Sequence, residues 1–326
     1  MGEVGWSTSP ASGEVGGTPG EGSSTYRGRF APSPTGDLHF GSLVAAVGSY
    51  LDARAHRGAW LVRIEDLDPP RERSGSADRI LRALESLGLQ WDGPVLRQST
   101  RASAYAEALE KLSGLDLVRT CRCSRSALAA LPQNLERPPG EELFHPAHCI
   151  VEGPEAAPGH ALRLRVPDQP VEFTDRAQGR IRTNLATACG DFVLQRRDGL
   201  HAYQLAVVVD DAWQGITDVV RGADLLESTP RQIVLQRALG LRTPGYLHLP
   251  LAVDDKDRKL SKSEDAPALG QGAPGAAIRA ALEFLRQKPP RELADASAAE
   301  ALDWGVAHWQ PAAFAGVRER RVEACS

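Results

Sequence analysis

The segment from Arg29 to Ser42 is the feature that most constrains the fold of this chain. It reads Arg-Phe-Ala-Pro-Ser-Pro-Thr-Gly-Asp-Leu-His-Phe-Gly-Ser, so an apolar start gives way to proline and glycine. Proline and glycine stop a strand and form a turn, and the pattern predicts a helix that begins near Gly41. Small residues at this helix start would let a nucleotide phosphate approach the backbone, with His39 facing it. The segment therefore predicts a phosphate-binding strand, turn and helix.

Strand and helix patterns alternate along the rest of the chain. The first stretch predicts strands at about 27–32 and 60–65, and helices at about 41–57, 74–88 and 102–112. A later stretch predicts strands at about 191–195, 205–209 and 219–220, followed by a helix at about 225–239. Because this alternation is typical of parallel βαβ units, we interpret the stretches as two halves of an α/β fold with a doubly wound parallel sheet. An insertion of about 75 residues separates the halves.

On this interpretation the chain divides into five segments. The first residues are rich in Gly, Ser, Thr, Glu and Pro, and they cannot bury enough surface to offset the entropy lost on ordering. The last part predicts helices at about 274–287 and 292–304, separated by a Lys-Pro-Pro turn. The expected segments are a disordered extension (1–26), the first half of the α/β domain (27–115), an inserted subdomain (116–190), the second half (191–270) and a short helical C-terminal region (271–326).

Composition narrows the class of protein further. With 326 residues, of which 42% are hydrophobic and 25% charged, the chain can bury a large core. A net charge of −4 argues against indiscriminate binding to nucleic acids, although it is compatible with a local basic face. The first residues lack a basic and apolar leader, and no apolar run reaches membrane-spanning length. We therefore expect a cytoplasmic protein with no membrane partner. As a separate expectation, the chain is a monomer.

A second short motif lies far downstream, at Lys259-Leu260-Ser261-Lys262-Ser263. It would place two ammonium groups on a flexible loop. Such groups suit a triphosphate, because they can stabilise phosphate charge as it moves during a reaction. Either this motif or the first is weak evidence alone, but the two together indicate a nucleotide-activating site.

Several metal-ligand residues gather within the predicted insertion. Cys121 and Cys123 form a Cys-x-Cys pair, and His145 and His148 lie close before Cys149. Four ligands of this kind suit tetrahedral zinc, although the spacing is less specific than a double Cys-x-x-Cys site. Reduced thiols without metal are the alternative. The two remaining cysteines of the chain show no pairing pattern, so no disulfide framework is expected.

The two motifs resemble the HIGH and KMSKS signatures of class I aminoacyl-tRNA synthetases. His39-Phe40-Gly41-Ser42 stands for the first signature, and Leu260 replaces the usual Met of the second. The string from Arg29 to Leu43, followed by Arg63-Ile64-Glu65-Asp66-Leu67-Asp68, narrows the resemblance to the glutamyl branch. Full-length glutamyl enzymes carry a large helical domain beyond the second signature, whereas 63 residues follow Ser263 here. The chain therefore resembles the short glutamyl-Q tRNA(Asp) synthetase family, from about Arg27 onward.

This resemblance implies an enzyme that activates L-glutamate with ATP and transfers it to queuosine in the anticodon of tRNA(Asp). Glutamate offers two carboxylates and one ammonium, so its site needs guanidinium donors and a carboxylate. By motif, Glu65 would face the ammonium, and the other residues expected to bind glutamate are Arg29, Phe30, Ala31, Pro32, Ser33, Tyr203 and Arg221.

The resemblance also assigns the residues that would bind ATP. Among them His39 and Lys262 would be catalytic, and Mg²⁺ would be held mainly by the ATP phosphates. The full set expected to bind ATP is His39, Gly41, Ser42, Lys259 and Lys262.

For the metal, the resemblance implies one structural zinc on Cys121, Cys123, His145 and Cys149. Members of the family often carry a Tyr-x-x-x-Cys element at the last two of these positions. His145 occupies the Tyr position, which leaves the choice between His145 and His148 open.

Two other functions compete with this one. The chain could be an ordinary glutamyl-tRNA synthetase that charges a terminal ribose, or a synthetase-like protein without catalysis. The missing room for an anticodon domain argues against the first. The joint presence of Arg29, His39, Glu65 and Lys262 argues against the second.

Overall fold

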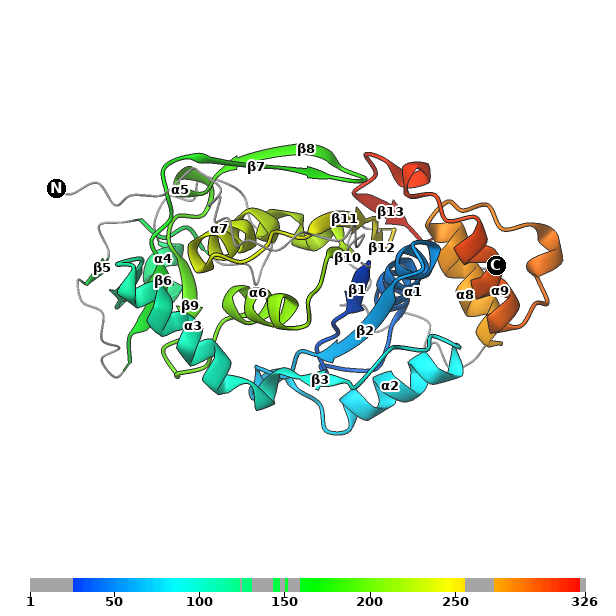
Figure 1. Cartoon of the computed structure of the whole chain (residues 1–326), viewed down its shortest axis with the longest axis horizontal. Coiled ribbons are helices and arrows are strands. Elements are labelled where there is room, and N and C mark those ends of the chain that lie inside the picture. Colours follow the sequence, from blue (N-terminus) through cyan, green and yellow to red (C-terminus); the bar gives the residue numbers. More distant parts are fainter. Residues whose placement is uncertain are drawn as a thin grey trace, which may run out of the picture.

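The computed structural model describes residues 26–123, 125–130, 143–146, 150–151, 159–255 and 273–322 (Figure 1). The expected disordered extension therefore lies outside the described residues except for Tyr26. The whole Lys259–Ser263 motif lies outside them too, as do His148 and Cys149.

A set of parallel strands forms the centre of the molecule. Strand β1 (Arg27–Phe30) pairs with β2 (Ala59–Ile64), and β2 pairs with β3 (Leu96–Arg97). Strands β10 (Asp218–Gly222) and β11 (Gly245–Leu249) form a second parallel pair. β1 lies beside β10, where the N–H of Thr217 donates to the carbonyl of Arg27 at 2.9 Å. The spatial order is therefore β3-β2-β1-β10-β11, in which strands from the two predicted halves lie side by side.

Helices cover these strands where the sequence predicts them. The main ones are α1 (Phe40–Ala55), α2 (Ser76–Ser86), α3 (Ala102–Gly114) and α7 (Thr229–Leu239). Helix α1 is buried along most of its length and packs closely on β11, because Gly48 has no side chain there. A Cβ at Gly48 would come within 2.5 Å of the Leu249 side chain. The remaining short helices are η1 (Pro69–Arg71), η2 (Gln98–Thr100), α4 (Arg125–Ala129), α5 (Leu185–Ala188) and η4 (Ala223–Ser228).

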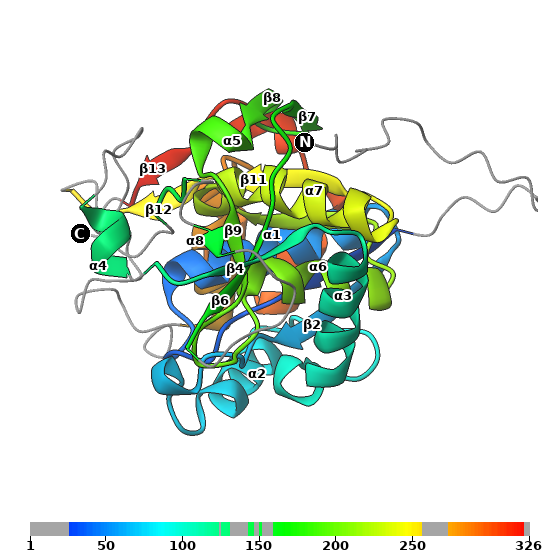
Figure 2. The same cartoon turned by 90° about the vertical axis from the view of Figure 1, so that its left-hand side faces the viewer.

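Two strand predictions were wrong: one predicted strand is helical, and the other pairs in a different sheet from the one expected. The strand expected at 205–209 is part of helix α6 (Tyr203–Trp213). The strand expected at 191–195 exists as β9 (Phe192–Gln195), but it joins an antiparallel sheet with β5 (Ile150–Val151), β4 (Val118–Cys121) and β6 (Ala161–Leu164). Short apolar runs do not distinguish a buried helix from a buried strand, and they do not specify the partner strand. Figure 2 faces this antiparallel sheet.

A long hairpin makes the central sheet mixed instead of purely parallel. Strands β7 (Pro170–Asp175) and β8 (Gly179–Asn184) pair antiparallel, and β7 also meets β11 in parallel where Asp175 faces Tyr246. In Figure 1 the hairpin runs along one edge of the molecule, from the antiparallel sheet back to the C-terminal part. The hairpin thus brings Asp175 to the central strands.

The C-terminal part packs on the outer side of α1. Helices α8 (Pro274–Phe284) and α9 (Ala298–Ala307) share one apolar core with α1 and β2. Helix α9 begins later than expected, because a capping box between Ser297 and Glu300 fixes its start. Strand β13 (Glu319–Arg321) pairs with β12 (Leu251–Val253), and η6 (Arg291–Leu293) and η7 (Pro311–Phe314) complete the region. Within the described ranges, none of the helices has the length and apolar character needed to span a membrane.

Candidate active site

Three buried arginines lie near the carboxyl ends of adjacent parallel strands. Arg29 is in β1, Arg63 in β2 and Arg221 in β10, and each is at most 5% exposed. In open α/β sheets, ligands bind beyond the carboxyl ends of the strands, where the strand order reverses. A buried cluster of cations at this place indicates a site for an anionic ligand.

Asp211, in α6, holds two of these arginines in place. Its Oδ1 accepts from Arg29 Nε at 3.1 Å and from Arg63 Nη1 at 2.7 Å. Burial alone would raise the pKa of Asp211, but the charges of Arg29 and Arg63 and their hydrogen bonds lower it. Sequence reasoning missed Asp211. The available signal was a pair of acidic residues, Asp210 and Asp211, at the end of an otherwise apolar run.

Glu65 follows β2 and lies between the arginines and the first motif. Its carboxylate accepts from Arg63 Nη2 at 3.3 Å, and its backbone N–H donates to the carbonyl of Pro32 at 2.9 Å. Burial raises the pKa of Glu65, while the charges of Arg63 and Arg29 oppose that shift. A buried carboxylate of this kind can accept a ligand ammonium.

Tyr203 completes the cluster from the start of α6. Its hydroxyl accepts from Arg221 Nη1 at 3.4 Å. Burial raises the pKa of Tyr203, and its hydroxyl also lies within electrostatic reach of Arg221, Glu65 and Arg29. The structure therefore brings together four residues that the sequence predicts to bind glutamate, from β1, from the loop directly after β2, from α6 and from β10.

A second layer of residues orients Arg221. Its Nε donates to His248 Nε2 at 3.1 Å, and its Nη2 donates to the hydroxyl of Thr229 at 2.8 Å. On the other side of the imidazole, His248 Nδ1 lies 2.7 Å from a carboxylate oxygen of Asp175. Both Asp175 and His248 are buried. A neutral imidazole with its proton on Nδ1 satisfies both contacts.

The pKa of His248 agrees with a neutral imidazole. Burial lowers this pKa, the hydrogen bond to Asp175 opposes the shift, and the charge of Arg221 adds to it. Sequence reasoning missed both His248 and Asp175. Neither residue belongs to a short motif, and the two are 73 positions apart.

The first motif forms the N-terminus of α1. His39 is the N-cap residue, and its Nδ1 accepts from the N–H of Ser42 at 3.3 Å. The Ser42 hydroxyl lies 2.9 Å from His39 Nε2. Gly41 occupies the first turn of the helix, where exposed N–H groups and the helix dipole favour a phosphate. Before the helix, Phe30 is buried, Ala31 and Pro32 are half-buried, and Ser33 is exposed.

Three of the four predicted metal ligands converge at the edge of the antiparallel sheet. Ligand atoms of Cys121, Cys123 and His145 all lie within 4.8 Å of one another, and Cys121 Sγ is 2.9 Å from His145 Nε2. Two such ligands of one tetrahedral zinc would be about 3.6 Å apart, so a small opening of this contact would admit the ion. The donor set and its compactness fit zinc.

Gly190 fixes the backbone position of His145. A Cβ at Gly190 would come within 2.0 Å of the His145 carbonyl oxygen, and Gly190 has a φ of 66°. The N–H of His145 donates to the carbonyl of Cys189 at 3.0 Å, directly before this glycine. The expected fourth ligand, Cys149, and the alternative His148 lie outside the described residues.

Comparison with known proteins agrees with this geometry. The model of the catalytic domain of class I tRNA synthetases (E and Q) matches residues 25–270. Fold and site thus define a class I tRNA synthetase catalytic domain. Within this class, the chain belongs to the family of the glutamyl-Q tRNA(Asp) synthetases. Curated proteins of that name from Pseudomonas aeruginosa and Dechloromonas aromatica are 56% and 54% identical over 286 residues, covering 88% of this chain and 94% of each relative.

Solved structures give the same result for the fold. The crystal structure of a glutamate-tRNA synthetase from Elizabethkingia anophelis superposes with a TM-score of 0.73 and 25% identity, over 92% of this chain and 68% of that one. A glutamate tRNA ligase from Elizabethkingia meningosepticum, in complex with its amino acid, gives 0.74 and 25%, over 92% and 67%. The resemblance inferred from the motifs is thus confirmed at the level of the family.

Proposed function

We propose that this enzyme activates L-glutamate with ATP and transfers it to the queuosine base in the anticodon of tRNA(Asp). The observation that carries the proposal is the convergence of Arg29, Arg221, Tyr203 and Glu65 at the ends of parallel strands. The name of the relatives, which align over 94% of their length, supports the same activity.

Glutamate fits the charges of this site. Arg29 uses Nε and Nη2 for Asp211, which leaves Nη1 for a ligand carboxylate. Arg221 supplies the second guanidinium, oriented by His248 and hydrogen-bonded to Tyr203. Glu65 receives the ammonium. Glutamine would leave one buried guanidinium without its carboxylate, and such underpaired groups disfavour binding strongly.

In the first step, an α-carboxylate oxygen of glutamate attacks the α-phosphorus of ATP. A new P–O bond forms, the bond to the β-phosphate oxygen breaks, and pyrophosphate leaves with the electron pair. His39 and the first turn of α1 stabilise phosphate charge, Lys262 holds the departing pyrophosphate, and Lys259 contributes to ATP binding. Mg²⁺, held mainly by the phosphates, would neutralise part of their charge. The protein contributes position and electrostatics, without a covalent intermediate.

In the second step, a hydroxyl of the queuosine base attacks the activated carbonyl. A C–O ester bond forms, the acyl phosphate bond breaks, and AMP leaves while the hydroxyl loses its proton. Cys121, Cys123 and His145 lie at the edge of the antiparallel sheet, and none of them contacts the arginine cluster in the described structure. We therefore propose a structural role for a zinc ion on Cys121, Cys123, His145 and Cys149.

The test is a transfer assay with labelled glutamate. We expect glutamylation of tRNA(Asp) that carries queuosine and none of tRNA(Asp) from cells unable to make queuosine. Glutamate should also drive exchange of pyrophosphate into ATP, and glutamine should not. Glutamylation of tRNA(Glu) at its terminal ribose, with none on queuosine, would assign the chain to the ordinary synthetases. Absence of exchange would identify a protein without catalysis.

A further inference from the structure

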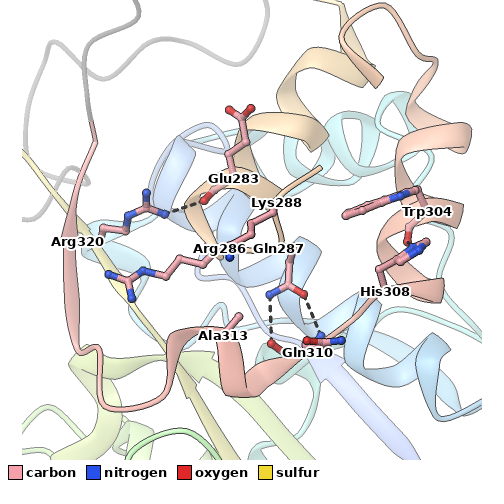
Figure 3. Close-up of a pocket in the computed structure, with 9 residues that line it drawn as sticks. All are labelled: Glu283, Arg286, Gln287, Lys288, Trp304, His308, Gln310, Ala313 and Arg320. Carbon is pink, nitrogen blue, oxygen red and sulfur yellow. Dashed lines mark hydrogen bonds between the residues drawn. The ribbon is translucent and has the colours of Figure 1, made fainter. Parts of the chain in front are cut away.

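A cavity of about 790 Å³ lies in the C-terminal part, apart from the glutamate site (Figure 3). Its lining includes three cationic side chains, Arg286, Lys288 and Arg320. The one acidic residue of the lining, Glu283, forms an ion pair with Arg279 at 2.7 Å, so its charge is compensated. In a chain with a net charge of −4, this cavity is locally basic and suits an anionic ligand.

The loop after α8 is fixed in a conformation that presents two of these cations. Arg286 and Lys288 are exposed and adopt left-handed backbone angles, with φ of 56° and 54°. Between them, Gln287 is buried and accepts from the N–H of Gln310 at 2.9 Å. Its Nε2 donates to the carbonyl of Leu285 at 2.7 Å. Left-handed angles at residues other than glycine are unfavourable, and they persist where the surroundings enforce them, often at functional sites.

An aromatic pair forms another wall of the cavity. The rings of Trp304 and His308 stack with their centroids 4.4 Å apart and an interplanar angle of 14°. Trp304 is half-buried, and both rings line the cavity, opposite the arginines in Figure 3. A flat π surface beside several cations is the arrangement that binds single-stranded nucleic acid, because bases stack on the rings while phosphates meet the cations.

Side-chain contacts also link the cavity to the N-terminus of α1, where the first motif lies. Arg320 Nη1 donates to the carbonyl of Glu283 at 2.7 Å, and its guanidinium lies 5.6 Å from the centre of the Phe284 ring. Phe284 in turn meets Phe40 edge to face, with centroids 5.6 Å apart. Phe40 directly follows His39. The rings of Phe284 and Phe40 therefore link Arg320, in the wall of the cavity, to the first residue of α1.

We propose that this cavity binds a single-stranded segment of the RNA substrate while an adjoining nucleotide occupies the active site. Arg286 and Lys288 contact phosphates, and one base stacks against Trp304. The inference rests on the proposed function, which requires an RNA loop at the catalytic cleft. The combination of cations with a stacking surface favours RNA over an anion that lacks a base.

The first test measures RNA binding by wild type and by the double variant Arg286→Ala/Lys288→Ala. The probe is fluorescently labelled tRNA(Asp) that carries queuosine. The matched control is Arg82→Ala/Arg242→Ala, which removes two exposed arginines from other elements. We expect the cavity variant to bind about tenfold more weakly. The slope of log Kd against log salt concentration should fall by about 1.4 to 1.8, as expected for two lost phosphate contacts.

The second test addresses stacking. Trp304→Leu should weaken RNA binding about tenfold, whereas Trp304→Phe should retain most of it, because base stacking tolerates a smaller ring. Glutamate-dependent exchange of pyrophosphate into ATP needs no RNA in this proposal, so unchanged exchange in every variant would show that the fold is intact. If the double variant Arg286→Ala/Lys288→Ala loses exchange, the single variant Lys288→Ala replaces it in the RNA-binding test.

The outcomes separate the cavity from the proposed function. If wild type glutamylates tRNA(Asp) with queuosine but the cavity variants bind RNA as tightly as the control variant, the inference is wrong. If wild type transfers no glutamate to queuosine while the cavity variants still bind the RNA more weakly than the control, the proposed function fails and the RNA site stands.

Discussion

At the scale of single residues, the two carboxylates that pair with Arg63, those of Asp211 and Glu65, differ in the strength of their ion pairs. Asp211 pairs with both Arg29 and Arg63, and its pKa is lowered. Glu65 also pairs with Arg63, but its carboxylate oxygen lies 3.3 Å from Arg63 Nη2, compared with 2.7 Å between Asp211 and Arg63 Nη1. The pKa of Glu65 is raised. Two carboxylates of the same cluster thus differ in role: Asp211 fixes the arginines, and Glu65 keeps capacity for a ligand cation.

The first prediction concerns Glu65→Gln. An amide cannot pair with the glutamate ammonium, so we expect KM for glutamate in pyrophosphate exchange to rise about 10- to 100-fold, since charged hydrogen bonds contribute about 1.5 to 3 kcal/mol. The turnover number should change less. Steady-state exchange kinetics measure both quantities.

The pH profile gives a control for this role. Because the pKa of Glu65 is raised, its carboxylate protonates earlier than usual as pH falls, and KM for glutamate in wild type should rise in that direction. Glu65→Gln should lose this dependence. A variant with the same KM as wild type at neutral pH would exclude Glu65 from amino-acid binding.

The second prediction concerns the residues that position Arg221. Asp175→Asn removes the charge that holds the Nδ1 proton of His248, so Arg221 loses its fixed acceptor. We expect KM for glutamate to rise about tenfold with a smaller change in turnover, since the loss corresponds to about 1.4 kcal/mol. His56→Asn is the control, because His56 stacks on Tyr26 at the far end of α1. Equal KM values in both variants would contradict this role.

The third prediction concerns stability and His248. Its folded pKa is lowered, so the unfolded chain binds a proton at higher pH than the folded chain does. The free energy of unfolding should therefore fall as pH drops from about 6.5 toward the folded pKa. His248→Asn should lack this component. Urea unfolding between pH 7 and pH 5 measures it, and parallel curves for the two proteins would contradict it.

Local motifs made part of the site predictable at this scale. Arg29, His39 and Glu65 lie in contiguous signatures, so the resemblance identifies them. Asp211 lies 182 positions from Arg29, and no local pattern links the two residues. Pairings of this kind depend on the folded arrangement of distant elements.

At the scale of elements, the sequence predicted three of the parallel strands and the main helices, but it did not predict the parallel strands β3 and β11. Strands β1, β2 and β10 and helices α1, α2, α3 and α7 were predicted because strand and helix patterns alternate clearly there. The apolar run at 205–209 contains several valines, which favour strands, but it is a buried part of α6. Burial on all sides removes the polar face that would have revealed a helix.

The fourth prediction concerns the antiparallel sheet and its proposed zinc. Purified protein should contain about one zinc per chain, as expected for a closed structural site. Cys123→Ser should lower this content and the midpoint of thermal unfolding, whereas Cys325→Ser, outside the proposed ligand set, should leave both unchanged. Elemental analysis of protein prepared without chelator measures the content. Absence of zinc in wild type would instead support the alternative that these cysteines are reduced thiols without a metal.

At the scale of the whole molecule, the C-terminal part contains a strand pair, an aromatic contact and a cavity that the two predicted helices did not indicate. Sequence reasoning predicted two short helices that close the catalytic domain. The structure also pairs β13 with β12, packs Phe284 edge to face against Phe40 and forms a basic cavity. Lys288 lies in the predicted turn, but the clustering of Arg286 and Lys288 with Arg320 and Trp304 arises from tertiary packing, so composition alone could not show it.

The fifth prediction concerns the acceptor. If the reacting hydroxyl belongs to queuosine, the terminal adenosine of the tRNA takes no part in the transfer step. The RNA is then recognised through a splayed loop and its phosphates instead of a paired acceptor stem. Trimming the terminal adenosine from tRNA(Asp) should leave the rate of glutamate transfer within about twofold of the rate for intact tRNA, a difference below about 0.5 kcal/mol.

An isolated anticodon stem-loop that carries queuosine should also accept glutamate. The cavity variant Arg286→Ala/Lys288→Ala should lose transfer to this short RNA more than it loses adenylate formation, because the RNA then depends on the cavity for its remaining contacts. The matched RNA control is the same stem-loop with guanosine in place of queuosine, which should accept none. Loss of transfer on trimming the adenosine, with full activity on intact tRNA, would place the acceptor at the terminal ribose and contradict the proposed function.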